Sequence, residues 1–181
     1  MAVRRVVTGH DEDGKAVFAS DEEVEPVTID LAPGMEFYRL WSLDETAHFP
    51  DDGSPAPAGT YFPPVGGLRF GLFSVPPQST AAPADDLDVE AAFAQAEERV
   101  PGLAGHMEPD HPGMHTTATV DYEIIISGRV VLELDDGATR ELGPGDTVIQ
   151  NGTRHAWHNP FDEPCLLAVV LVGAHHDNVA S

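Results

Sequence analysis

Cysteine is nearly missing from this sequence, and long apolar runs are missing altogether. The one cysteine, Cys165, excludes an intrachain disulfide and indicates a reducing compartment. Nowhere do roughly 18 uncharged apolar residues follow one another, so the sequence offers no transmembrane helix. The first residues, MAVRRVV, also lack the apolar stretch of a secretory signal. We therefore expect a cytoplasmic protein that does not bind a membrane.

Positive charge is scarce as well. Nine Lys and Arg residues stand against 31 Asp and Glu residues, which gives a formal net charge of −22 at pH 7 with histidine neutral. A field of this sign repels phosphate backbones and anionic lipids before any local patch can attract them. The acidic balance therefore argues against nucleic acid as a partner, and we interpret most of the acidic residues as solvated surface.

Glycine and proline, by contrast, are abundant, with 17 and 16 residues among 181. They cut the chain into short segments, a pattern typical of β-strands joined by turns. We expect one domain in three parts: N-terminal strands with a Pro/Gly-rich loop at 1–80, a helix with the barrel core at 81–173, and a flexible tail at 174–181. The expected strands are 3–8, 15–19, 27–31, 36–41, 68–75, 114–127, 129–134, 138–142, 146–150, 155–159 and 165–172.

One segment has the pattern of a helix. Between Leu87 and Val100, the apolar residues Val89, Phe93 and Ala96 fall on one helical face together with Val100. Acidic residues precede this segment and Pro101 follows it, as suits the two ends of a helix. We predict one short helix that covers a sheet or barrel end.

The longest predicted strand has a polar face and an apolar face, because successive side chains of a strand point to opposite sides. The polar face carries His115, Thr117, Thr119, Asp121 and Glu123. Two interpretations follow from this alternation. Either the polar row lies in solvent, or it lines a polar pocket inside a barrel whose outer face is covered by other strands or by another subunit.

Two groups of residues stand at characteristic spacings: His115, Thr117, Asp121 and Gly128 first, then Gly152, His155 and Asn159. These spacings resemble the two motifs of the cupin superfamily, whose fold is a small antiparallel jelly-roll barrel. The first motif is HxH, three or four residues, Glu, six residues and Gly, so Thr117 and Asp121 replace the second histidine and the glutamate. In the second motif, Gln150 and Asn151 replace the usual proline region. The pairing of HTTATVDY with QNGTRHAWHN further resembles a subgroup of single-domain cupins with an HxTxTxDY motif.

The resemblance implies a metal site. In ordinary cupins, three imidazoles and one carboxylate hold a divalent metal ion inside the barrel, and here the matching residues are His115, Asp121 and His155. Two imidazoles and a carboxylate suit iron, zinc, manganese or nickel. Thr117 cannot replace an imidazole as ligand, whereas Glu123 could supply a longer carboxylate than Asp121. A metal-free pocket is the alternative.

Other residues could complete this site. Glu123 could serve as a catalytic acid or base in apolar surroundings, or be structural if it pairs with Arg154 or Arg69. Substrate-binding candidates are Thr117, Trp157, which could stack on a flat ring, and Asn159. His106 and His111, in the loop before the first motif, could each fold over the barrel mouth as a missing ligand.

The function implied by the resemblance is a metal-dependent enzyme that acts on a small organic acid, a phenol or a polyketide-like molecule, as a decarboxylase, dioxygenase or isomerase. A metal-free small-molecule-binding cupin and a metal-free acid–base isomerase or cyclase stay open as alternatives. Apolar outer strands and the N-terminal hairpin favour a homodimer.

Overall fold

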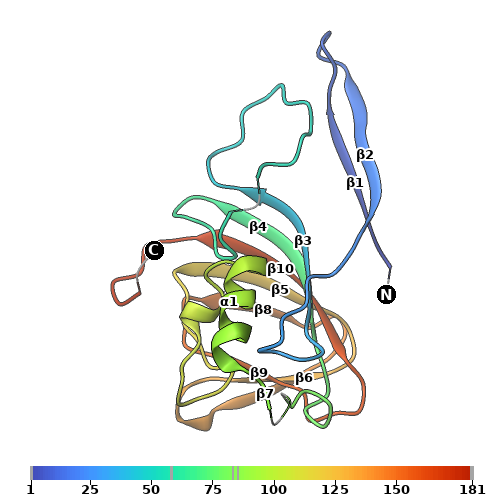
Figure 1. Ribbon diagram of the computed structural model, residues 1–181. Coiled ribbons are helices and arrows are strands. Elements are labelled where there is room, and N and C mark those ends of the chain that lie inside the picture. The colour runs from blue at the N-terminus through green and yellow to red at the C-terminus, as the bar shows by residue number, and fades with distance from the viewer. Residues whose placement is uncertain (1, 58, 83, 85, 180–181) are drawn as a thin grey trace.

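The structure, a computed structural model, describes residues 2–57, 59–82, 84 and 86–179. Within these residues it consists of ten β-strands, one α-helix and two single-turn 3-10 helices (Figure 1). The bounds are β1 Val3–His10, β2 Ala16–Val24, β3 Glu36–Leu43, β4 Leu68–Val75, α1 Val89–Arg99, η1 Ala104–His106, β5 Thr119–Ser127, β6 Val130–Glu133, η2 Asp135–Gly137, β7 Thr139–Leu142, β8 Thr147–Asn151, β9 Ala156–His158 and β10 Cys165–Gly173.

Two antiparallel sheets form the body of the molecule. The larger has the strand order β3-β4-β10-β5-β8, and the smaller has the order β7-β6-β9. Every strand pair is antiparallel, so the sequence-based prediction of an all-β jelly-roll barrel with one helix is confirmed. Strands β3 and β4, from the predicted 1–80 region, extend the larger sheet by pairing with the C-terminal strand β10.

The N-terminal hairpin β1–β2 forms a separate two-stranded sheet, as its turn-rich HDEDG segment predicts. Figure 1 shows it extending away from the barrel. Near its base, Val3 and Val24 pack against Tyr38 and Leu40 of β3. The predicted strand at 27–31 is absent among the described residues, and only Val27 forms an isolated bridge.

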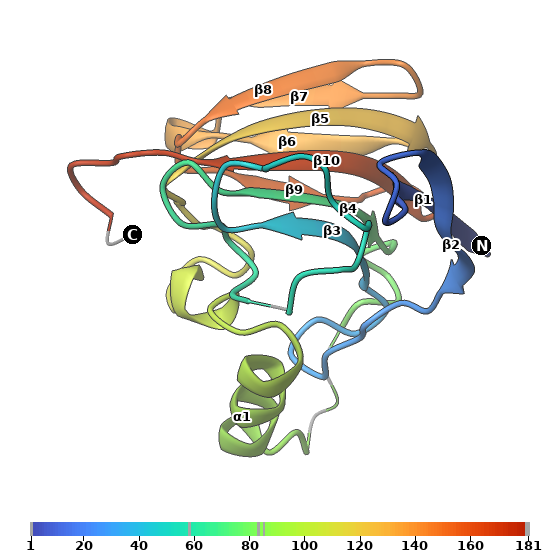
Figure 2. The ribbon, with the colours of Figure 1, turned by 90° about the horizontal axis from the view of Figure 1, so that it is seen from above.

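Helix α1 lies outside the strands, in front of them in Figure 1 and set off from them in Figure 2. Asp88 caps its N-terminus by accepting a hydrogen bond from the Ala91 amide at 3.1 Å. The predicted apolar face was wrong in part, because Val89 and Phe93 are exposed. The helix instead approaches the barrel through small residues, Ala92 and Ala96, which are buried. None of the helices in the described part of the chain is long and apolar enough to span a membrane.

The Pro/Gly-rich loop crosses the end of β10 at very close range. The amide of Gly66 donates to the carbonyl of Gly173, and the amide of Gly173 donates to Gly67, each at 3.0 Å. A Cβ at residue 173 would lie 1.8 Å from the carbonyl oxygen of Pro64, so only glycine fits here. This contact fixes the loop over the end of the larger sheet.

The larger sheet has an apolar outer face that no described part of the chain covers. Its exposed members are Tyr122, Ile124 and Ile126 on β5, Ile149 on β8 and Phe70 on β4, each between 40% and 51% exposed. Alternation places them opposite the buried residues of the same strands. We call these five residues the outer patch. The hairpin adds further exposed apolar side chains, and Phe18 is 80% exposed.

We expect a second copy of the chain to cover the outer patch. A patch of uncharged residues can face its own copy across a two-fold axis, and the projecting hairpin, which is marginal as an isolated two-stranded unit, gains contacts in such a pair. Light scattering after size exclusion should report a dimer. Ile124→Asp should shift the protein to monomer, whereas Leu134→Asp, at an exposed leucine outside the patch, should leave the dimer intact. A monomeric wild type at micromolar concentration contradicts this expectation.

Candidate functional site

The polar row of β5 faces the barrel interior. Thr117, Thr119, Asp121 and Glu123 are all buried, with at most 5% of each residue exposed. The hydroxyl oxygens of Thr117 and Thr119 are 2.8 Å apart, within hydrogen-bond distance, and Thr119 also hydrogen-bonds to Asp121. Of the two interpretations of this strand, the solvent-exposed polar row was therefore wrong. The row lines the interior instead.

Two carboxyl groups in this row have buried oxygens without a partner. Among the described residues, nothing hydrogen-bonds to Asp121 Oδ1 or to Glu123 Oε2, and the same holds for Nε2 of Gln150, which pairs with Asp121 in register on β8. The pairing of Glu123 with Arg154 or Arg69 is not found, because Arg154 binds Glu108 and Asp135 while Arg69 binds Asp44.

Burial makes both carboxyl groups weak acids. It raises the pKa of Asp121 to about 6, against a smaller opposing contribution from the Thr119 hydrogen bond. It raises the pKa of Glu123 to about 8, and the neighbouring Asp121 adds to this shift. At neutral pH, Glu123 thus retains its proton while Asp121 is largely ionised.

His115 and His155 lie side by side on neighbouring chain segments. Their backbones exchange two hydrogen bonds of 3.0 Å in an isolated antiparallel bridge, and their ring centroids are 4.2 Å apart. Nδ1 of His115 lies 2.9 Å from the carbonyl oxygen of Gly113, and Nδ1 of His155 lies 2.9 Å from that of Thr153. A carbonyl only accepts, so each Nδ1 carries the proton and each Nε2 presents a lone pair.

Burial keeps both rings neutral. It lowers the pKa of His155 to about 3, with a further contribution from His115. Burial also lowers the pKa of His115, where nearby His106 acts in the same direction while Gly113 and Glu108 oppose it. Two neutral imidazoles with accepting Nε2 atoms therefore sit at one place in the barrel.

The predicted metal ligands do not come together in this structure as a set of three. Among the described residues, no group of three or more His, Cys, Asp or Glu side chains is placed to hold a metal ion. His115 and His155 are adjacent, but Asp121 does not complete a site with them. Metal binding by His115, Asp121 and His155 stays a prediction.

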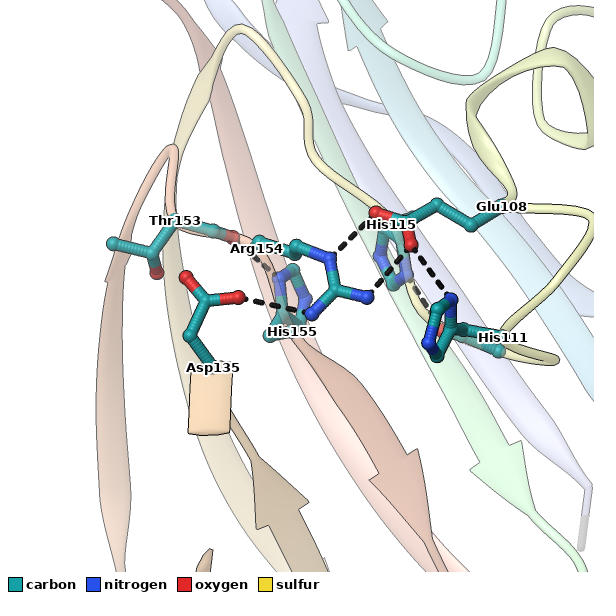
Figure 3. Close-up of polar contacts among 8 residues, drawn as sticks. Glu108, His111, His115, Asp135, Thr153, Arg154 and His155 are labelled. Carbon is teal, nitrogen blue, oxygen red and sulfur yellow. Dashed lines mark hydrogen bonds and ion pairs between the residues drawn. The ribbon is translucent and has the colours of Figure 1, made fainter. Parts of the chain in front are cut away.

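An ion-pair cluster clamps the segment before His115 to the segment before His155 (Figure 3). Arg154 donates to both carboxylate oxygens of Glu108 at 2.6 and 2.7 Å and to Asp135 at 2.9 Å. His111, which is exposed, lies 3.4 Å from Glu108. The Arg154 guanidinium lowers the pKa of Glu108 mainly through their hydrogen bonds. The clamp holds the loop that carries His111 beside the histidine pair.

The remaining candidates have structural contacts. Nδ1 of His106 is 2.7 Å from the Gly102 carbonyl oxygen, and its ring contacts Phe62. Trp157 packs against the apolar core with its ring edge-on to His155, at 6.3 Å between centroids. Asn159 uses its amide group to donate to two backbone carbonyls and accepts from the Phe161 amide. Substrate contacts by Trp157, Asn159 and Thr117 stay predictions.

Sequence reasoning missed Tyr61, which the Pro/Gly-rich loop inserts into the barrel. Its ring packs edge-on against that of Phe37, with 5.6 Å between the ring centroids, and its backbone amide donates to the Pro101 carbonyl at 2.8 Å. Burial raises the pKa of its hydroxyl, and Asp121 and Glu123 raise it further. Tyr61 therefore shares the interior with the acid pair. Loop 47–67 has no periodicity, so no sequence pattern points to this residue.

The second half of the chain matches a known protein family. Residues 104–172 match the Cupin_2 family model, described as the cupin domain. This segment contains β5 to β9, nearly all of β10 and both site histidines. This segment of the chain is thus similar to the cupin domain, in agreement with the two sequence motifs that it contains, whereas a place in the HxTxTxDY subgroup stays a prediction.

Individual relatives match a shorter segment. Oryzines biosynthesis cluster protein J of Aspergillus oryzae is 43% identical over 54 residues, 28% of this chain and 30% of that protein. The cupin-domain-containing oxidoreductase virC of Hypocrea virens is 41% identical over 46 residues, 25% of this chain and 24% of that protein. The chain thus spans less than a third of these curated relatives. A solved cupin 2 conserved barrel domain protein of Salinispora arenicola is 20% identical, with 84% of this chain and 90% of that one covered at a TM-score of 0.42.

The acid pair makes stability depend on pH. Because the pKa of Glu123 is raised to about 8 in the fold, its contribution to stability is complete below its unfolded pKa of 4.5 and is lost as the pH rises through about 8. The free energy of unfolding of the wild type, measured with urea, should therefore fall between about pH 5 and pH 8. Glu123→Gln should flatten this decline and be the more stable protein at the alkaline end.

The matched control is Glu98→Gln on the exposed side of α1, which should keep the wild-type decline. All measurements are made with a chelator present. If Glu123→Gln and the wild type lose stability in parallel, Glu123 does not carry a raised pKa.

Proposed function

We propose that this chain is a cupin enzyme that moves a proton on a small organic molecule bound in the barrel, without a metal ion. The observation that carries the proposal is the buried pair of Asp121 and Glu123, each with an oxygen that no described residue engages. Burying such groups is costly unless a partner satisfies them. A bound substrate would supply this partner.

The two carboxyl groups differ in a way that suits acid–base chemistry. Glu123 retains its proton at neutral pH and can donate it, whereas Asp121 is mostly ionised and can accept one. A proton removed from one position of the substrate by Asp121 and one returned at another by Glu123 amounts to an isomerisation, with no change of oxidation state. The same steps support a cyclisation.

The surroundings favour a small molecule with an organic acid, phenolic or polyketide-like skeleton. Tyr61, Phe37 and Trp157 supply aromatic surface near the polar row. Relatives named for biosynthesis clusters, such as the Aspergillus oryzae protein, support a role in which such a skeleton is processed. The neutral imidazoles of His115 and His155 would accept hydrogen bonds from it.

Proton exchange with solvent tests the proposal directly. Small carboxylic acids, phenols and diketides are incubated with the protein in D2O, and deuterium at carbon is followed by NMR. We expect enzyme-dependent exchange with at least one of these compounds, reduced about a hundredfold or more in Glu123→Gln. Glu98→Gln should exchange at the wild-type rate. Exchange that survives in Glu123→Gln would exclude Glu123 as the acid.

A second candidate is a metal-dependent cupin of the decarboxylase or oxygenase type. The specific observation is the histidine pair, in which backbone carbonyls fix both Nδ1–H groups and leave both Nε2 atoms available as ligands. A metal ion there would supply Lewis-acid or redox chemistry. The relative named as a cupin-domain-containing oxidoreductase favours this candidate.

Elemental analysis distinguishes the two candidates. The protein is purified without a histidine tag and measured for iron, zinc, manganese and nickel, beside His115→Ala and His155→Ala. For the metal-free enzyme we expect well under about 0.1 equivalents of each metal, and no uptake on addition. A near-stoichiometric metal that is lost in both variants would instead establish the second candidate.

A further inference from the structure

Arg39 is unusual among the nine basic residues, all of which lie in the described part of the chain. Six of them form ion pairs with acidic side chains: Arg4, Arg5, Lys15, Arg69, Arg129 and Arg154. Of the other three, Arg99 and Arg140 are exposed, and Arg39 is partly buried. In a chain with 31 acidic residues, a partly buried guanidinium without an acidic partner is unexpected, because its charge is partly removed from water and not neutralised.

The register of the larger sheet places Arg39 in the same row as the acid pair. Arg39 pairs with Gly71, Gly71 with Val169, and Val169 with Glu123. Three strand steps of about 4.8 Å separate Arg39 from Glu123, or about 14 Å between their backbones. Residues in one row of a sheet point to the same side, so Arg39 shares the inner face with Glu123. Gly71, which has no side chain, and the buried Val169 lie between them in this row.

Most of the hydrogen-bonding capacity of Arg39 is unused. Its Nη2 donates to the Gly59 carbonyl at 2.7 Å, but Nε and Nη1 bond to no described residue. A cavity of about 20 Å³ lies against Arg39, Tyr61, Phe37 and Trp41. This is room for one water-sized polar group. A carboxylate oxygen is such a group, and a guanidinium is the donor best matched to it.

The electrostatics at this end of the barrel also favour an anion. Burial lowers the pKa of Arg39, and the charge of Arg69 lowers it further. The charge of Arg69 is itself offset by Asp44 at 2.7 Å. Arg39 thus remains the unbalanced positive charge, and an anion beside it would restore the balance.

We infer that Arg39 anchors the carboxylate of a small organic acid in the barrel, with the remainder of the molecule directed along the row toward Glu123. This inference rests on the proposed function, for which it names the substrate class and a specificity-determining residue. The acid pair lies too far away to repel the anchored carboxylate directly. It faces the uncharged end of the molecule instead.

Binding of carboxylates and their amides tests this role. The probes are benzoate and butanoate, with benzamide and butanamide as neutral counterparts of nearly the same shape, titrated by calorimetry at moderate salt. We expect the wild type to bind at least one carboxylate about tenfold or more tightly than its amide. Arg39→Gln should lose this preference, weakening carboxylate binding by about tenfold to a hundredfold. Arg140→Gln, at an exposed unpaired arginine, should bind as the wild type does.

Two further variants keep the result interpretable. Arg39→Lys retains the charge but not the guanidinium bond to Gly59, and should bind the carboxylate about fivefold or more tightly than Arg39→Gln. If both variants are equally weak, Arg39 only positions the loop and the inference fails. It fails too if the wild type binds no carboxylate up to about 50 mM, or binds acid and amide alike. Glu123→Gln should lose proton exchange but keep the wild-type preference for carboxylate over amide, so loss of proton exchange and loss of anchoring are separate outcomes.

Discussion

The burial of polar side chains on the inner face of β5 is the constraint on which the rest of this structure depends. Asp121 and Glu123 lie inside the barrel with oxygens that have no partner in the described chain. Such burial lowers stability, and the opposite end of the barrel has to offset it. That end is closely packed: Ile125, Val130 and Leu167 are each at most 1% exposed. One strand, β5, passes from the polar end to the apolar core within a few residues.

The loops that carry Tyr61 and the segment before His115 determine which side chains surround the polar row. Arg69 donates to the backbone of Thr60 and of Leu43, and Arg39 donates to Gly59, so two arginines from β3 and β4 hold the segment that delivers Tyr61. On the other side, the Glu108–Arg154 pair holds the segment before His115. The site is thus shaped by irregular segments that are fixed to a regular sheet, the common arrangement for functional loops on a rigid scaffold.

Much of the fold and part of the site could be predicted from the sequence. Nearly all the strands were predicted from turn residues between short apolar runs. The motif spacing identified His115 and His155, which form a β-bridge in the structure. The alternation of side chains along the strand predicted that Asp121 and Glu123 share one face. It could not tell whether that face lies in solvent or inside a barrel, because a two-residue period carries no information about what packs against the face.

Other features lay beyond any sequence pattern. The α1 prediction failed at Val89 and Phe93, which are exposed, because helical periodicity identifies a face but not how much of that face a neighbour covers. The positions of Tyr61 and Arg39 on the inner side of the barrel were not predicted either. Their place in the barrel comes from sheet order and from a long loop, both of which are tertiary. No local period encodes that β10 lies between β4 and β5.

The central position of β10 has a consequence for how this protein can change over evolutionary time. Because β10 pairs with β4 on one side and β5 on the other, it joins the part of the sheet that carries Arg39 and Arg69 to the part that carries the acid pair. Substitutions in the hairpin or the tail leave that pairing unaltered. A single-residue insertion within β10 would slip its pairing by one and turn its own buried side chains, such as Leu167 and Val169, to the outside. Length variation among descendants should therefore accumulate in the loops and spare this strand.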